Sequence, residues 1–163
     1  MIELFKKVRE VLRRASMHNG RSKTTDPVAI LTESYRDLLS LAAQISNHAD
    51  RAPYPHVARL LRRIAQEKQS SADVVRQKLV GSRTSQEEVP FEIKSGKNHW
   101  ERMAQDLNDH RALEARLLER AALLDEEAPE MAELLRQIGA SHRPHMEALL
   151  DLIARADPQA EQT

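Results

Sequence analysis

The sequence has no cysteine, only four glycines and few aromatic residues, which make up 3% of its 163 positions. The lack of cysteine excludes disulfides, thiolate metal sites, iron–sulfur clusters and cysteine nucleophiles. No apolar run approaches the about 20 residues of a membrane-spanning helix, and no signal-peptide core is present. The isolated glycines form no phosphate-binding loop. These absences predict a soluble, cytoplasmic protein.

The residues that are abundant, namely alanine, leucine, arginine and glutamate, favour helices over sheets. The chain length suits one domain with one sizeable core. The formal net charge is zero, so we expect no general nucleic-acid binding. The charge is unevenly distributed, with a basic segment at residues 1–23 and an acidic one at residues 125–163.

Four long amphipathic helices are predicted from apolar residues that recur every three or four positions. Asp26 and Pro27 start the first, because an aspartate cap followed by proline is a typical helix start. The other three begin at Pro55, after Gly96 and at Pro129. The predicted helices therefore cover about residues 27–49, 55–80, 97–124 and 129–153, and Trp100 falls on the inner face of the third.

The segment from Gly81 to Gly96 determines the expected topology. Fifteen extended steps reach roughly 50 Å, whereas a helix of about 25 residues is about 38 Å long. The segment can therefore run the length of the bundle and make the second and third helices parallel. Val89, Phe91 and Ile93 alternate within it, as an extended crossover lying on the bundle requires. The alternative is a loop that joins two antiparallel helices.

Polar residues interrupt the apolar faces of a repeated motif. The phrase Pro-x-(apolar)-Ala-x-Leu-Leu-Arg-x-Ile occurs at 55–64 and again at 129–138. At matching distances beyond the two copies lie Lys68 and Ser71, then His142 and His145. Unsatisfied polar groups on a buried face cost about 1–3 kcal/mol each, so they need partners. With His110 and Glu114 of the third helix, we expect these six residues to converge at mid-bundle.

With these features, the chain resembles the ferritin-like superfamily, most closely the rubrerythrin-type four-helix bundles, over about residues 27–156. The resemblance implies an all-α, ferritin-like bundle at residues 26–157. In that family the second and fourth helices each carry Glu-x-x-His, the first and third each give a Glu, and two irons are bound. Here the two motifs have become Lys68-x-x-Ser71 and His142-x-x-His145, which implies a degenerate di-iron site.

Two interpretations of the polar cluster follow, besides the alternative that it does not converge. Either His142, His145 and Glu114, with His110, bind one iron, zinc or manganese ion, or Lys68 replaces the metal and donates to Glu114. We favour the second, because an ammonium repels a dication. Ser71 and Tyr35 would then line the site. Pro144, inside the fourth helix, predicts a kink there.

The preferred function is that of a non-enzymatic binding or assembly scaffold. We expect a homodimer or a higher homo-oligomer, with Leu39, Leu118 and Leu150 as exposed apolar contacts. The alternative is a metal-dependent protein of ferritin or rubrerythrin type, for metal storage or oxidative-stress redox chemistry. Residues 1–25 are predicted to be a basic amphipathic helix and a linker, and residues 1–16 could dock on a membrane surface or a protein partner. Residues 158–163 form a tail, and His48 and His99 are expected at the surface.

Overall fold

Five α-helices are present in the computed structural model, which describes residues 26–81 and 91–156. The predicted N-terminal helix, Val89 of the crossover and the tail at 158–163 lie outside these residues. No strand occurs within the described ranges. The helices are α2 (Pro27–Asp50), α3 (Pro55–Leu79), α4 (His99–Leu124), α5 (Pro129–Ala140) and α6 (His142–Arg155).

The helix starts follow from the sequence signals. The Asp26 side chain accepts a hydrogen bond from the Val28 amide at 3.0 Å, and proline occupies an early position of α2, α3 and α5. Asn98 caps α4 by accepting from the Glu101 amide at 2.8 Å, and the Glu101 carboxylate in turn accepts from the Lys97 amide. These side chains satisfy backbone donors that a helix terminus leaves without partners.

The fourth bundle helix is divided into α5 and α6 at Ser141, as the predicted kink requires. Pro144 has no amide proton to donate to the Ala140 carbonyl, so the regular helix hydrogen bonding is interrupted. At the break, the Ser141 hydroxyl donates to the Ile138 carbonyl at 2.6 Å. The break places His142 at the start of α6, close to the middle of the combined helix.

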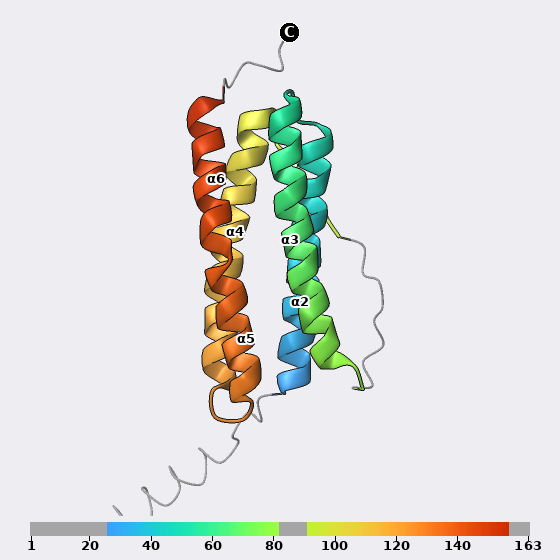
Figure 1. Ribbon diagram of the computed structural model, residues 1–163, viewed down its shortest axis with the longest axis vertical. Coiled ribbons are helices and arrows are strands. Elements are labelled where there is room, and N and C mark those ends of the chain that lie inside the picture. Colours follow the sequence, from blue (N-terminus) through green and yellow to red (C-terminus); the bar gives the residue numbers. More distant parts are fainter. Residues whose placement is uncertain (1–25, 82–90, 157–163) are drawn as a thin grey trace, which may run out of the picture.

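Figure 1 shows the topology. Helices α2 and α3 run antiparallel, α3 and α4 run parallel, and α5–α6 return antiparallel to α4. The end of α3 and the start of α4 therefore lie at opposite ends of the bundle, as the length of the crossover predicts. The expected fold class, an all-α four-helix bundle with a long second-to-third crossover, is confirmed.

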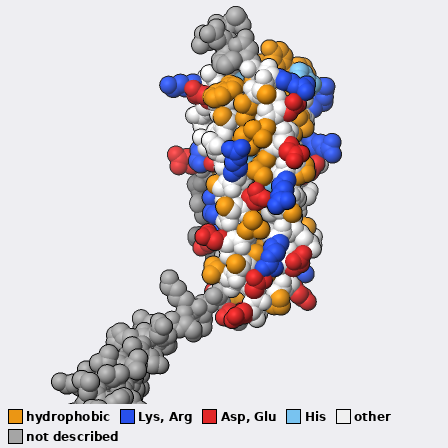
Figure 2. All heavy atoms as spheres, turned by 90° about the vertical axis from the view of Figure 1, so that its left-hand side faces the viewer, with side chains coloured by type: hydrophobic (Ala, Val, Ile, Leu, Met, Phe, Trp, Pro, Cys, Tyr) orange, Lys and Arg blue, Asp and Glu red, His pale blue; other side chains and the backbone are white. Residues whose placement is uncertain are grey.

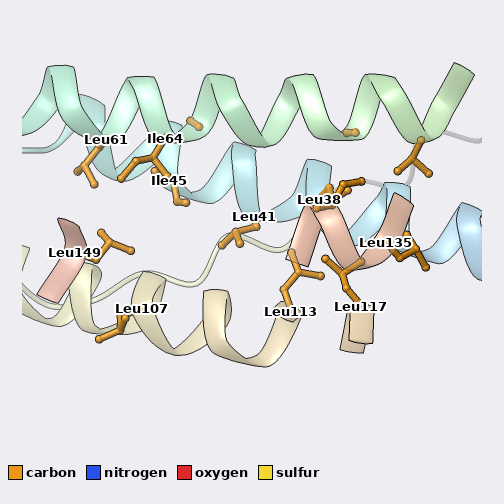
Figure 3. Packing of buried hydrophobic residues seen from close by; sticks show 14 of the residues in the cluster. Leu38, Leu41, Ile45, Leu61, Ile64, Leu107, Leu113, Leu117, Leu135 and Leu149 are labelled. Atoms are coloured by element: carbon orange, nitrogen blue, oxygen red, sulfur yellow. The ribbon is translucent and has the colours of Figure 1, made fainter. Parts of the chain in front are cut away.

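The core consists mainly of leucine, with alanine, isoleucine and valine, and all the helices contribute to it. Figure 3 shows leucine and isoleucine side chains directed into the space that the helices enclose. Burying one such side chain contributes about 1.5–3 kcal/mol. Trp100 was expected in this core, and that prediction is wrong: at the first turn of α4 it is 38% exposed. None of the described helices is long and apolar enough to cross a membrane.

Candidate functional site: a buried lysine and histidine cluster

The middle of the bundle contains four nitrogen-bearing side chains that we call the central nitrogen cluster: Lys68 of α3, His110 of α4, and His142 and His145 of α6. Lys68, His110 and His142 are fully buried, and His145 is 7% exposed. The ring centroid of His110 lies 5.5 Å from that of His142 and 5.9 Å from that of His145. The structure therefore brings together four of the six residues that were expected to converge.

Two of the three imidazoles are held from outside the cluster. His110 Nδ1 lies 2.9 Å from the Asp106 carbonyl oxygen, and His145 Nε2 lies 2.5 Å from Oε2 of Glu67 on α3. Their other nitrogens, both nitrogens of His142 and Nζ of Lys68 have no hydrogen-bond partner among the described residues. Five buried nitrogen atoms of one cluster thus remain without a protein partner.

Burial dominates the electrostatics of this cluster. It lowers the pKa of Lys68 from 10.5 to about 7, because the interior solvates an ammonium poorly. Burial, with the nearby Lys68 charge as the second cause, lowers the pKa of His110 to about 3 and that of His142 in the same direction. The hydrogen bond from His145 lowers the pKa of Glu67. At neutral pH the buried rings are therefore uncharged, while Glu67 is a carboxylate.

Ser71, Glu114 and Tyr35 do not take part in the cluster. The Ser71 hydroxyl donates to the Glu67 carbonyl of its own helix at 3.1 Å. Glu114 lies 3.5 Å from the Arg143 guanidinium near the surface, so the expected ion pair between Lys68 and Glu114 is not formed. The carboxylate stays partly hydrated there, which avoids the desolvation that an interior ion pair requires.

Tyr35 instead lines a surface groove of about 550 Å³ between α2 and α3, beside Phe91 of the crossover. Helical periodicity alone placed it on the inner face, but it lies at the edge of the apolar stripe. Across the described ranges, no group of three or more histidine, aspartate or glutamate side chains is arranged to hold a metal ion. The predicted ligand set of His110, Glu114, His142 and His145 stays a prediction.

A second buried polar group, which we call the crossover clamp, consists of Gln44, His48, Lys94, Asp106 and Asp109. His48 Nδ1 lies 2.9 Å from both carboxylate oxygens of Asp106, and its Nε2 lies 2.9 Å from the Lys94 carbonyl oxygen. Gln44 donates to both aspartates and accepts from the Lys94 amide at 3.4 Å. Two side chains of α2 thus bind both backbone groups of Lys94, and Asp109 of α4 accepts from its side-chain amine at 2.8 Å.

The clamp was not predicted, and the expectation that His48 and His99 lie at the surface is wrong, since they are 1% and 3% exposed. A signal was present in the sequence. Leu41, Gln44, Ile45 and His48 follow the spacing of a single helix face, so His48 continues a buried stripe. The histidine was assigned to the surface because it lies near the helix end.

Known structures share this arrangement of helices. The chain is similar to a mycobacterial bacterioferritin, with a TM-score of 0.71 and 19% identity over 79% of this chain and 83% of the other. It is also similar to the Mycobacterium tuberculosis bacterioferritin BfrA, with a TM-score of 0.68 and 20% identity over 79% of this chain and 84% of the other. The chain has a ferritin-like fold. Within this fold, the resemblance to rubrerythrin-type bundles in particular stays a prediction.

Sequence comparison adds nothing to the ferritin-like assignment, because no protein-family model and no curated protein matches the chain. At about 20% identity the likeness concerns the fold alone. The likeness therefore carries no information on chemistry, which depends on the side chains that this bundle contains.

Proposed function

We propose that this ferritin-like bundle is a binding and assembly scaffold that lacks a di-iron oxidase centre. The observation that carries the proposal is the position of Lys68, which is fully buried at mid-bundle with its amine beside three neutral histidines. A lysine there supplies a positive charge, or a neutral amine, where the resemblance would require a carboxylate ligand.

The charges of the central nitrogen cluster support this proposal. Two ferrous ions bring four positive charges, and oxygen ligands such as carboxylates normally compensate such hard cations. The cluster contains no carboxylate, and Glu67, its nearest acidic neighbour, is bound to the outer nitrogen of His145. A donor set of four nitrogens, one of them an ammonium, does not fit a pair of irons.

Exposed apolar side chains on α4 and α6 support an assembly role. Leu118 and Leu123 of α4 and Leu150 of α6 are 45%, 59% and 46% exposed. Figure 2 shows one face of the bundle, where apolar side chains follow its length between charged ones. Contiguous apolar surface of this kind is typical of protein contacts. Leu39, expected to be a contact residue, is only partly exposed and lines the groove between α2 and α3.

The assembly role can be tested with the full-length protein by analytical ultracentrifugation over a concentration series. We expect a dimer or a higher homo-oligomer, and dissociation in the double variant Leu118→Gln/Leu150→Gln. Val74→Gln, which changes a 41% exposed apolar residue on α3, is the matched control and should leave the assembly intact. A wild-type protein that sediments as a monomer throughout would contradict the assembly role.

The loss of the di-iron centre is tested by elemental analysis of protein purified without a histidine tag. We expect no stoichiometric pair of irons per chain, even after anaerobic incubation with ferrous iron and removal of the excess. Two irons per chain that disappear in His142→Ala/His145→Ala would show that the bundle has kept the centre, and would contradict the proposal.

A further inference from the structure

The tautomers of two histidines follow from their outer partners. A carbonyl oxygen can only accept, so His110 Nδ1 carries the proton that bonds the Asp106 carbonyl. The Glu67 carboxylate likewise accepts from Nε2 of His145. In neutral rings, the remaining nitrogens, His110 Nε2 and His145 Nδ1, then hold lone pairs, and both are buried and unbonded among the described residues. Both rings therefore offer an acceptor to the bundle interior.

His142 adds a third acceptor. Its ring nitrogens make no hydrogen bond of regular geometry within the described ranges, while the His110 backbone, acting as a hydrogen-bond acceptor, opposes the lowering of the ring's pKa by burial. A neutral imidazole has one bare nitrogen in either tautomer. Three lone pairs from α4 and α6 thus belong to one buried cluster, and its nearest carboxylate, Glu67, is bound to the outer nitrogen of His145. Such a set repels anions and favours a cation.

Lys68 is the cation that the chain itself places there. Its side chain is fully buried, and its Nζ has no partner among the described residues. An ammonium has three donors, which match three imidazole lone pairs in number and in polarity. We propose that the central nitrogen cluster is a single-cation site, for which the Lys68 ammonium and one imidazole-preferring divalent transition-metal ion compete.

The outer hydrogen bonds support the metal as the second occupant. Histidines that bind metals almost always donate their other ring N–H to a carboxylate or a backbone carbonyl, which fixes the tautomer and the ring orientation. His110 and His145 already make these two kinds of bond. Their free nitrogens therefore have the protonation state that a Zn²⁺ or Co²⁺ ion requires.

The ring separations show how far the cluster must adjust. A metal about 2.1 Å from a ring nitrogen lies about 3.2 Å from the ring centroid, so two rings in tetrahedral coordination have centroids about 5 Å apart. The observed separations are 5.5 and 5.9 Å. With Lys68 in place the described residues form no three-ligand site, so binding requires a small inward shift of the rings and removal of the amine. Lys68 thereby keeps the metal affinity of the wild type low.

The test is a Co²⁺ titration of tag-free, full-length Lys68→Met, followed by visible absorption. We expect one Co²⁺ per chain with the intense bands of tetrahedral coordination. Its affinity should be at least about tenfold above that of the wild type, because even in bulk water the repulsion between a nearby ammonium and a dication lowers the metal affinity by about that factor. The double variant Lys68→Met/His142→Ala should lose this binding. Lys78→Met, on the exposed face of α3, is the control and should behave as wild type.

A folded Lys68→Met protein that binds Co²⁺ no more tightly than wild type would overturn the proposal. So would binding that survives His142→Ala. A measurement without any variant is the ¹⁵N NMR assignment of the histidine tautomers in the wild type, which should find His110 protonated on Nδ1 and His145 on Nε2. The opposite tautomers would refute the acceptor cluster. Neither result depends on the assembly role, because sedimentation tests that role separately.

Discussion

Removing the Lys68 amine should stabilise the protein below pH 7, and the size of the effect follows from the burial of the amine. The pKa of Lys68 falls from 10.5 to about 7 in the folded protein, and burial is the main cause. Each unit of pKa is worth about 1.4 kcal/mol, so holding the proton in the folded state costs up to about 5 kcal/mol. Methionine has a similar length, needs no hydration and fills irregular apolar space.

The sign of the pH dependence follows from proton binding. Between about pH 7 and pH 10.5 the unfolded chain holds the Lys68 proton and the folded protein does not, so unfolding takes up a proton. The free energy of unfolding of the wild type should therefore rise with pH across this window. The penalty is fully present below about pH 7 and vanishes above the unfolded pKa.

We therefore expect Lys68→Met to exceed the wild type by about 2–5 kcal/mol near pH 6, and the difference to shrink to below about 1 kcal/mol near pH 10. The assay is urea unfolding followed by circular dichroism across this range, with a chelator present so that metal binding does not contribute. Lys78→Met, an exposed substitution on the same helix, corrects for the general effect of losing a lysine. Wild-type and Lys68→Met stabilities that stay parallel from pH 6 to pH 10 would refute the argument.

Two further substitutions test the crossover clamp and the α5–α4 contact. His48→Ala should lower the free energy of unfolding by about 1–3 kcal/mol, because it removes a buried hydrogen-bond partner of Asp106 and of the Lys94 carbonyl. Urea unfolding measures this, with the exposed His56→Ala as the control, and an equal effect of the two would contradict the role of the clamp. Gly139→Ala should raise the free energy of unfolding by about 0.5–1 kcal/mol, because alanine favours the helix and its Cβ would meet Leu118 at an ordinary 3.8 Å. A lower melting temperature for Gly139→Ala would show that α5 tolerates no side chain there.

The fold could be predicted from the sequence because its main determinants are local. Proline and capping residues mark the helix starts, and the three-to-four spacing of apolar residues marks the inner faces. The length of the segment between Gly81 and Gly96 was sufficient to predict parallel α3 and α4. The break at Ser141 followed from Pro144, since a missing amide proton interrupts any helix.

The candidate site could be predicted only in part, because side-chain direction depends on neighbours that periodicity does not identify. Lys68, His110, His142 and His145 lie near the centres of apolar stripes, and they are buried as expected. Glu114 lies at the edge of its stripe, where Arg143 across the helix interface attracts it outward. Such a competing surface partner cannot be found from the pattern of one helix.

The clamp was missed for a related reason. Its members come from three separate segments, and each residue is ordinary within its own segment. A polar residue at a helix end is usually exposed, whereas His48 is covered by the crossover, which lies 46 residues further along the chain. Only the tertiary fold shows that a carboxylate and a backbone carbonyl meet it there.

The hydrogen bonds from Gln44 and His48 to the Lys94 backbone divide the crossover into two stretches, which should differ in how far their lengths vary among homologues. Beyond Lys94, only four residues precede α4, so the position of that helix is fixed by an anchor on α2. Insertions and deletions between Gly81 and Phe91 are then absorbed before the anchor, and they leave the alignment of α4 with its neighbours unchanged. Homologues should accordingly vary in length ahead of this anchor and keep a constant spacing behind it.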